Sequence, residues 1–382
     1  MAVSLVLGAL ALISLVLTLW QWLEARRFPL HRRAGDTSFA PAVTVLKPLK
    51  GAEAPTAACL RSWFSQDYAG PVQILFGIAA EDDPAGQIVR ALLVEFPRAD
   101  AQLVVCPERL GANAKVSQLA QLERWVRHEI LMVSDADVRV PRDFVANVVA
   151  PLRDEQVGLV NPFYRLVEIR TPAMRWEALA VNADFWSGVL QSCRLAPMRF
   201  ALGAVMAVRR RHLEAVGGFR AFANRLADDF ELGRRVAGRG GRLVLSPVVV
   251  DCCHPPQGWG EVWRHQLRWS RTIRVCRPGA YALSLLSNGT LWPLLWLAFG
   301  SGPWVGAGAT VCLAVRVLTA LDNQRRLTQS LAHVPWCWLA PVKDLLQFVL
   351  WGLAFTGDTV EWRGQRYRVT RTGELVKKER AR

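Results

Sequence analysis

An uncharged apolar stretch near the start of the chain, residues 2–23, constrains the fold more than any other feature. Its 22 residues are enough for a helix that crosses a bilayer, and a buried core helix rarely needs that length. No basic segment precedes it, and it exceeds the apolar core of a signal peptide, so we expect a retained anchor. Arginines 26, 27, 32 and 33 follow directly. Because basic residues mark the cytoplasmic end of a span, we expect the remaining chain on the cytoplasmic side, at the inner membrane if the source is bacterial.

A second apolar block covers about residues 280–355. Residues 282–299 and 304–321 are predicted to form a hairpin of two short spans, each near the minimum length. Arg316 interrupts the second of them. The chain is therefore expected to meet the membrane at both ends.

The last part of this block, residues 335–355, is ambiguous because Lys343 and Asp344 stand in its middle. The segment could span the bilayer with these charges paired, or it could lie in the interface. The basic tail at residues 358–382 favours the interfacial alternative, since its charge would then return to the cytoplasm.

The charge balance is strongly basic, with 47 Lys and Arg against 32 Asp and Glu and a net charge of +15. Such an excess suits either nucleic acid or an anionic membrane surface. A mean hydropathy of +0.16 and 52% apolar residues favour the membrane. Much of the positive charge also lies at membrane borders and in the tail rather than in an aromatic-rich soluble patch, so we expect no nucleic-acid partner.

Eight cysteines are scattered through the chain, at positions 59, 106, 193, 252, 253, 276, 312 and 337. They form no C-x-x-C pair and no regular framework, which indicates reduced thiols in a cytoplasmic domain. Cys252, Cys253 and His254 are adjacent, but neighbouring residues of a strand point to opposite faces. We therefore expect no metal site at this triplet.

Between residues 41 and 250 the chain alternates β-rich runs with helical patterns. The predicted strands are residues 43–46, 72–78, 102–106 and 130–133, and the predicted helices are residues 57–66, 83–95 and 116–128. Such alternation predicts an α/β fold with a mainly parallel sheet covered on both faces. Ligands of these sheets lie beyond the carboxyl ends of the strands.

Asp135 and Asp137 follow the strand predicted at residues 130–133 directly, in V-S-D-A-D-V-R-V. In an extended chain both side chains would point the same way, where they repel each other unless a cation intervenes. Carboxylates suit Mg²⁺ or Mn²⁺, and such ions complete their coordination with substrate phosphates. Taken alone, the pair fits an ordinary turn equally well.

Other charged residues are predicted at the same edge of the sheet. Lys47 and Pro48 end the first strand, Asp83 follows the second, and Lys115 comes just before a helix whose amides favour anions. Each would suit a solvated loop by itself. Together they place cations and acids around one edge, as a nucleotide diphosphate with a metal requires.

Asp228 and Asp229 are predicted to open a helix that ends near Gly238. Both could cap that helix. Alternatively, one of them is a general base that deprotonates an attacking hydroxyl.

The segment H-Q-L-R-W-S-R-T-I-R puts Arg268, Arg271 and Arg274 on one face of a predicted helix. This face could rest on the membrane surface, or Arg268 could neutralise a departing diphosphate. Trp269 suits the headgroup level of a bilayer, which favours a lipid acceptor.

Taken in order, these segments resemble the ceramide glucosyltransferase family, with its closely similar bacterial hopanoid-pathway glycosyltransferases. The resemblance covers nearly the whole chain and is carried by V-T-V-L-K-P-L-K-G at 43–51, D-D-P-A at 82–85, G-A-N-A-K at 111–115, S-D-A-D-V-R-V at 134–140, D-D-F at 228–230, R-W at 268–269 and W-R-G-Q-R-Y-R at 362–368.

The resemblance implies an α/β GT-A (nucleotide-diphospho-sugar transferase) domain with an N-terminal transmembrane anchor and a C-terminal helical membrane block. It implies inverting transfer of a hexose from a UDP-sugar to a lipid hydroxyl. Glucose is the expected hexose, and a ceramide-type lipid is the expected acceptor. The implied divisions are an anchor at 1–25, a catalytic domain at 41–250, a membrane-proximal segment at 251–279, membrane helices at 280–357 and a basic tail at 358–382.

Roles follow from the resemblance position by position. Asp83 matches an aspartate associated with uridine. Asp137, with Asp135, matches the motif that binds Mg²⁺ or Mn²⁺ and the diphosphate, and Asp229 matches the expected base. We also expect Lys47, Pro48 and Lys115 at the donor site.

Arg268 and Trp269 match the end of the family's (Q/R)xxRW motif, where Arg268 would offset the charge of the leaving group. The first position of the motif is His265 here, which leaves the role of that position open.

Three alternatives remain open at this point. One is transfer of N-acetylglucosamine to a hopanoid polyol. Another is a processive polysaccharide synthase, which would need more spans and typically a glutamine at position 265. The third is a non-catalytic membrane scaffold, which the intact acidic residues disfavour.

Overall fold

The structure, a computed structural model, describes residues 1–362 and 365–377. Arg363, Gly364 and positions 378–382 of the predicted tail lie outside the described residues. The chain divides into two compact units, and neither is continuous in sequence. The helical unit comprises Met1–Pro29, Ile169–Ala196 and Pro256–Thr372, and the sheet unit comprises Leu30–Glu168, Pro197–Pro255 and Gly373–Arg382.

In the described part of the sheet unit, eight strands form one sheet in the order β3-β2-β1-β4-β7-β6-β8-β5. The strands are β1 (Val43–Pro48), β2 (Val72–Ile78), β3 (Asp100–Val105), β4 (Ile130–Ser134), β5 (Val138–Arg139), β6 (Val157–Val167), β7 (Val205–Arg209) and β8 (Arg242–Cys253). The four strands that the sequence predicts are mutually parallel neighbours. β7 runs antiparallel to β4 and β6, and β5 runs antiparallel to β8, so the α/β sheet is mixed.

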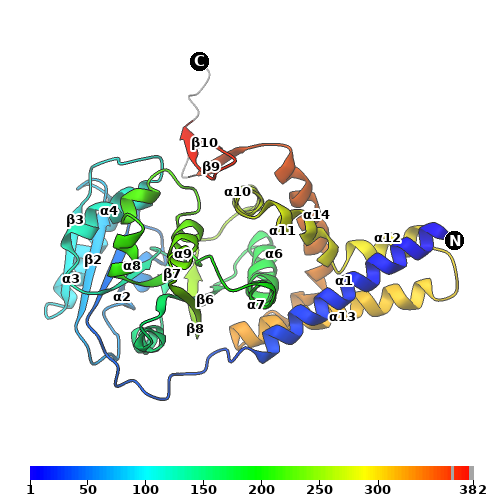
Figure 1. Cartoon of the computed structure of the whole chain (residues 1–382), viewed down its shortest axis with the longest axis horizontal. Coiled ribbons are helices and arrows are strands. Elements are labelled where there is room, and N and C mark those ends of the chain that lie inside the picture. Colours follow the sequence, from blue (N-terminus) through cyan, green and yellow to red (C-terminus); the bar gives the residue numbers. More distant parts are fainter. Residues whose placement is uncertain (363–364, 378–382) are drawn as a thin grey trace. The chain divides into compact units, whose positions relative to one another are not determined.

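Helices cover this sheet (Figure 1), and they are α2 (Thr56–Arg61), α3 (Pro84–Glu95), α4 (Ala114–Leu122), α5 (Phe144–Val149), α8 (Arg210–Ala215) and α9 (Asp228–Gly238). α4, α8 and α9 share one buried cluster with the central strands, which includes Leu46, Leu119 and Leu232. Trp63, just after α2, packs edge-on against Phe144 of α5, with ring centroids 5.5 Å apart. The core therefore holds the carboxyl ends of β1, β2 and β4 in fixed positions, and these ends carry the predicted site residues.

The helical unit contains α1 (Ala2–Arg27), α6 (Pro172–Leu179), a π-helix (Ala180–Phe185), α7 (Trp186–Leu195), α10 (Trp259–Cys276), α11 (Pro278–Leu283), α12 (Leu291–Phe299), α13 (Val305–Thr328) and α14 (Ala340–Phe355). It also contains an antiparallel hairpin of β9 (Thr359–Trp362) and β10 (Gln365–Val369), whereas β11 (Leu375–Lys377) belongs to the sheet unit. α1, α12 and α13 run side by side (Figure 1). Trp296 of α12 lies over Gly308 of α13, where an added Cβ would come within 2.5 Å of the indole.

Three helices within the described residues are long and apolar enough to cross a membrane: Ala2–Arg27, Val305–Thr328 and Val334–Phe355. The span predicted at residues 282–299 is not one straight helix. Pro278–Ser287 and Leu291–Phe299 instead meet at a 52° bend, as in a broken span or a re-entrant loop. Val334–Phe355 has the length and composition of a span, which supports the spanning alternative rather than the interfacial one that the tail favoured.

Paired burial of its charges explains why this last helix tolerates them. Arg316 donates to both carboxylate oxygens of Asp344, at 2.7 and 2.8 Å, and Lys343 lies 2.7 Å from the same carboxylate. Asp184 accepts from Arg316 at 2.8 Å and also from Lys343. Thr290 donates to Asp344 at 2.6 Å. Two cations and two anions thus balance each other inside the helical unit, as intramembrane charges require.

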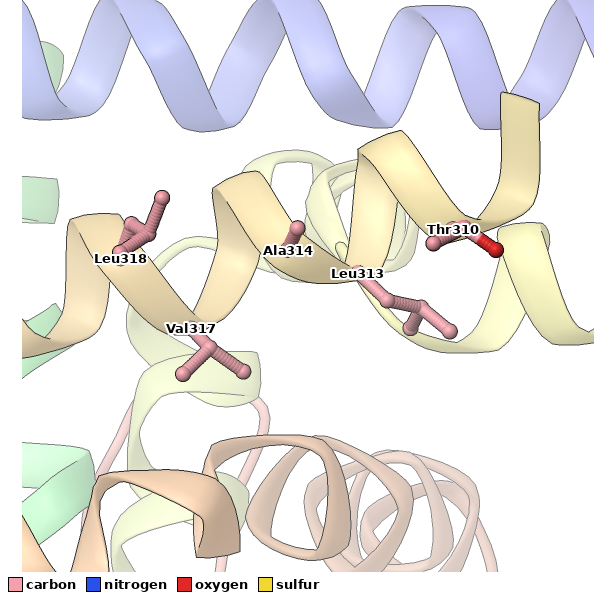
Figure 2. Close-up of a pocket in the computed structure, with 5 residues that line it drawn as sticks. All are labelled: Thr310, Leu313, Ala314, Val317 and Leu318. Carbon is pink, nitrogen blue, oxygen red and sulfur yellow. The ribbon is translucent and has the colours of Figure 1, made fainter. Parts of the chain in front are cut away.

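A hollow on the surface of the helical unit is lined by side chains of α13 (Figure 2), namely Thr310, Leu313, Ala314, Val317 and Leu318. The one hydroxyl among them, on Thr310, donates to the carbonyl of Gly306 at 2.8 Å. The hollow therefore presents mainly apolar atoms, which suits contact with lipid chains.

Candidate active site

Asp135 and Asp137 of the acidic motif were predicted to lie in an extended chain. They lie instead in a turn. β4 ends at Ser134, and the backbone N–H of Asp135 bonds to the carbonyl of Ala204 at 3.1 Å. Val138 then bonds back to Asp135 at 3.4 Å and starts β5. Because the chain turns between them, the two carboxylates do not share one face of a strand; each meets a different partner.

Asp135 pairs with Lys115, whose Nζ lies 2.6 Å from its Oδ1. The same ammonium is 3.8 Å from Asp228 Oδ2. Burial by itself would lower the pKa of Lys115, but the carboxylates of Asp135 and Asp228 outweigh it and raise that pKa. Asn113 caps α4 by accepting from Val116 at 3.1 Å and donates to Asp228 at 3.3 Å. The cap therefore fixes Lys115 between two acidic segments that are distant in sequence.

Asp137 faces His254, with 3.4 Å between Asp137 Oδ2 and His254 Nδ1. The backbone of Cys253 donates to the carbonyl of Asp137 at 2.9 Å, which fixes this register. Burial, and then the charge of Asp135, raises the pKa of Asp137. A cation bound nearby would stabilise the ionised form of such a carboxyl group.

His254 was not predicted as a site residue, because from the sequence it stands out only as the neighbour of two cysteines. The usable signal was a histidine directly after a β-rich run, at the edge of the sheet where the acidic motif lies. A carboxylate oxygen of Asp137 and a ring nitrogen of His254 could together hold a divalent cation such as Mn²⁺. No group of three His, Cys, Asp or Glu side chains gathers as a metal cage within the described residues, so further ligands would come from a substrate or water.

Lys47 lies fully buried beneath the acidic motif. Its Nζ donates to Ser134 Oγ at 3.0 Å and to the backbone carbonyl of Asp135, and lies 5.1 Å from the centre of the Trp63 ring. Burial lowers the pKa of Lys47 to about 8. Pro48 follows it as the last residue of β1 and is also buried. The structure therefore brings both residues next to the motif, where Lys47 supports its backbone.

Asp83 is the N-cap of α3 and accepts from the backbone of Ala85 at 3.0 Å. The same oxygen accepts from Gly51 at 2.9 Å. Gly51 has a left-handed φ of +70°, which glycine adopts without strain. Asp83 thus ties the loop after β1 to the start of α3.

Asp229 lies in the first turn of α9, and its Oδ1 accepts from Phe230 at 2.7 Å. Its Oδ2 occupies space that Gly203 leaves open, since a Cβ there would lie 2.8 Å from it. Burial, and then the neighbouring charge of Asp228, raises the pKa of Asp229 to about 7, although Lys115 opposes this. A carboxylate with that pKa can both take and release a proton near neutral pH.

The alternative that both aspartates cap α9 is wrong. The N-cap residue is Ala227, which makes no side-chain hydrogen bond to the helix, and Asp229 lies inside the first turn, where it accepts from the next residue, Phe230. Asp228 instead forms an ion pair with Lys115 and accepts a hydrogen bond from Asn113, whereas the pKa of Asp229 is raised. The two neighbouring carboxylates therefore have different environments, which is the pattern expected when one is an acid–base group.

Arg268 and Trp269 lie on α10 in the helical unit, whereas the other predicted site residues all belong to the sheet unit. Arg271 and Arg274 do not form a free basic face with Arg268. Arg271 donates to the carbonyl of Thr359, and Arg274 donates to that of Gly357 at 3.2 Å. These two arginines hold the segment that leads into β9.

Comparison with known proteins gives a match to the family model described as glycosyl transferase family 21, over residues 6–375. Ceramide glucosyltransferase 3 of Caenorhabditis elegans is 23% identical over 232 residues, which cover 59% of this chain and 49% of that protein. An N-acetylglucosaminyltransferase of Mesorhizobium japonicum is 26% identical over 249 residues, covering 61% of this chain and 56% of that protein. The matched part thus spans about half the length of these curated relatives.

Among solved structures, the fold is similar to the mannosyltransferase PcManGT from Pyrobaculum calidifontis, which was solved with GDP-Man and Mn²⁺. The TM-score is 0.54 at 23% identity, over 91% of this chain and 98% of that chain. At this identity the likeness shows the fold alone, and it confirms the predicted GT-A architecture.

Proposed function

Since the chain belongs to glycosyl transferase family 21, we propose that it moves a hexose from a UDP-sugar to a hydroxyl of a membrane lipid. We take glucose as the sugar and a ceramide-type lipid as the acceptor, with inversion at the anomeric carbon. The relatives named as ceramide glucosyltransferases support this choice. The sheet unit would work on the cytoplasmic side, as the basic residues after α1 suggest.

One observation carries the proposal. Lys115 joins Asp135 of the acidic motif to Asp228, and the next residue, Asp229, has a pKa of about 7. A cation that suits a diphosphate and a base that suits a hydroxyl therefore lie within one cluster of the sheet unit. Sugar transfer by single displacement requires both groups.

Asp137 and His254 fit the divalent cation of such a site, because Asp137 is a hard oxygen donor that resists ionisation without a cation. A Mg²⁺ or Mn²⁺ ion, when bound there, supplies positive charge against the diphosphate of the donor. Lys115 adds a second positive charge, and Asp135 holds it in place. We assign Asp83, with the loop it ties, to the uridine part of the donor.

In this mechanism Asp229 accepts the proton of the lipid hydroxyl while the hydroxyl oxygen bonds to the anomeric carbon. The bond from that carbon to the diphosphate breaks, and UDP leaves from the opposite face. We assign Arg268 to offset the charge of the leaving group, with Trp269 near the lipid headgroup. No covalent sugar–protein intermediate forms, so a second flanking carboxylate is unnecessary.

Transfer of N-acetylglucosamine to a hopanoid polyol is the second candidate, because the Mesorhizobium relative is named for that sugar. The two candidates share the site described above and differ in the sugar and lipid that they use.

The test incubates the purified full chain with Mn²⁺, a panel of UDP-sugars and either ceramide or a hopanoid polyol, and identifies products by mass spectrometry. We expect one hexose added per lipid, with UDP-glucose and ceramide as the best pair. N-acetylglucosaminyl lipid would favour the second candidate. Long polymer would support a polysaccharide synthase, and an absence of any transferred sugar would contradict the proposal.

A further inference from the structure

Glu177 of α6 is a buried carboxylate in the helical unit, with 1% of its surface exposed. Its Oε1 meets two side chains of α10, His265 Nδ1 at 2.7 Å and Gln266 Nε2 at 2.9 Å. A carboxylate taken out of water is costly unless hydrogen bonds satisfy it. The residues before the R-W pair on α10 therefore have a specific partner from a distant part of the chain.

The contact fixes the ring of His265. When Glu177 is ionised its carboxylate only accepts hydrogen bonds, and Nδ1 of His265 then donates to it. A histidine bonded at one ring nitrogen is held in one orientation, as in many catalytic and metal-binding sites. A quarter of the His265 side chain remains exposed, so the ring also reaches the surface of the unit.

The same ring packs against Trp269, one helical turn further along α10. Their ring centroids are 4.7 Å apart, with planes inclined by 58°. On its other side Trp269 lies 6.2 Å from Phe185, the last residue of the π-helix that follows α6. Trp269 is therefore held between two groups whose positions depend on the α6 segment.

We propose that Glu177 is a positioning residue for the R-W pair, acting through His265. By holding the imidazole it fixes the surface on which Trp269 packs, and with it the orientation of the neighbouring Arg268. The inference rests on the proposed function, in which these two residues serve sugar transfer. It also explains how histidine can replace glutamine or arginine at position 265: its ring needs a carboxylate partner to be held, and Glu177 supplies it.

The structure offers a matched control for this role. Gln266 is 3% exposed and donates to the same oxygen of Glu177, so it shares the carboxylate contact of His265 but supplies no aromatic ring to pack on Trp269. α6 and α10 also pack through Trp176, which lies 5.9 Å from Trp263. Loss of the Gln266 bond should therefore weaken the docking of the two helices without turning Trp269.

The experiment compares His265→Leu, His265→Gln and Gln266→Leu in the full chain, with a UDP-sugar and lipid that the wild type uses. We expect His265→Leu to lower kcat about tenfold or more, with the KM for the donor within about threefold. His265→Gln should keep more of the rate than His265→Leu, because its amide can still donate to Glu177 and be held beside Trp269. Gln266→Leu should lower the melting temperature but leave kcat near the wild-type value.

A double-mutant cycle then tests whether Glu177 acts through His265. Glu177→Leu, which removes the acceptor oxygen, should lower kcat in the wild-type background but change it less than about twofold in the His265→Leu background. Additive losses would overturn the proposal. A fall in kcat that follows the melting temperature equally in Gln266→Leu and His265→Leu would do the same, because it would indicate a purely structural role.

Failure of the proposed function gives a different result. If the wild type binds UDP with Mn²⁺ but transfers no sugar to any lipid tested, the function itself fails, and this proposal with it. If the wild type transfers sugar and His265→Leu is unimpaired, only the positioning role of Glu177 is overturned.

Discussion

At the scale of single residues, the adjacent carboxylates of Asp228 and Asp229 differ in what surrounds them. Asp228 is satisfied by Lys115 and Asn113, whereas burial and the charge of Asp228 raise the pKa of Asp229 to about 7. The same residue type is thus paired with a cation at one position and has a raised pKa at the next. The predictions at this scale concern Asp229 and the space around it.

The first prediction is the pH dependence of transfer. Asp229 acts as a base only when it is deprotonated, and its pKa is raised from 3.8 to about 7. We expect kcat/KM to fall about tenfold per pH unit below neutrality and to level off above it. Initial rates between about pH 5 and 9 with saturating Mn²⁺ measure this. A rate that stays constant down to pH 5 would contradict Asp229 as the base.

The second prediction concerns stability. The folded chain keeps the Asp229 proton to a higher pH than the unfolded chain, so the free energy of unfolding falls as the pH rises from 3.8 to about 7. Asp229→Asn replaces the titrating carboxyl by an amide, so this fall in the free energy of unfolding does not occur in the variant. We expect a higher melting temperature than the wild type at about pH 8 and little difference at about pH 4. Transfer should be abolished, while UDP binding is retained. A variant that melts earlier at pH 8 would indicate damage to the fold instead.

The third prediction uses the space beside Asp229. A methyl group at Gly203 would lie 2.8 Å from Asp229 Oδ2, so Gly203→Ala should displace the carboxylate. We expect transfer to fall about tenfold or more, with UDP binding retained. The matched control is Gly238→Ala at the end of α9, where nothing lies within 4 Å of an added Cβ. Equal losses in both variants would argue against a specific effect on Asp229.

Asp135, Asp137 and Asp229 could be predicted as site residues because each stands in a short local motif. The first two follow a predicted strand in D-A-D, and the third opens a predicted helix in D-D-F. His254 could not be predicted in this way, because its contact with Asp137 joins the end of β8 to a turn far earlier in the chain. The burial of Lys47 was equally hidden, since a lysine at a strand end is expected to reach solvent.

At the scale of elements, local pattern was most reliable for buried strands. The strand predicted at residues 72–78 matches β2 at both ends, because its apolar run is continuous and bounded by turn residues. The helix predicted at residues 57–66 ends earlier, at Arg61. The segment predicted as a span at residues 282–299 is bent, which could not be predicted because hydropathy reports apolar length and not straightness. Residues 284–287 form a 3₁₀ turn before the break.

The fourth prediction concerns α13 and α14, which are joined by Arg316 and Asp344. Without Arg316, Asp184 and Asp344 share the single positive charge of Lys343, so one buried negative charge is uncompensated and Arg316→Leu should destabilise the helical unit by about 3–5 kcal/mol. Removing both Arg316 and Asp344 should lower the free energy of unfolding by less, because Lys343 and Asp184 then remain as a balanced ion pair. Unfolding in detergent measures both variants. A double variant less stable than Arg316→Leu would refute the pairing argument.

At the scale of the whole molecule, the chain combines a GT-A-type sheet unit with a helical unit that contains three candidate spans within the described residues. Family membership and fold agree with what the ordered motifs had implied. The division into units could not be predicted, because Ile169–Ala196 groups with the apolar helices although it lies inside the range expected for the catalytic domain. Only long-range packing reveals that grouping.

Our main proposal is that Asp229 is the general base of a single inverting displacement by a lipid hydroxyl. The most direct measurement is the anomeric configuration of the glycolipid that the purified chain forms from an α-linked UDP-sugar, determined by NMR, with Asp229→Asn assayed beside it. We expect a β-linked product from the wild type and none from the variant. An α-linked product, or substantial product from Asp229→Asn, would contradict it.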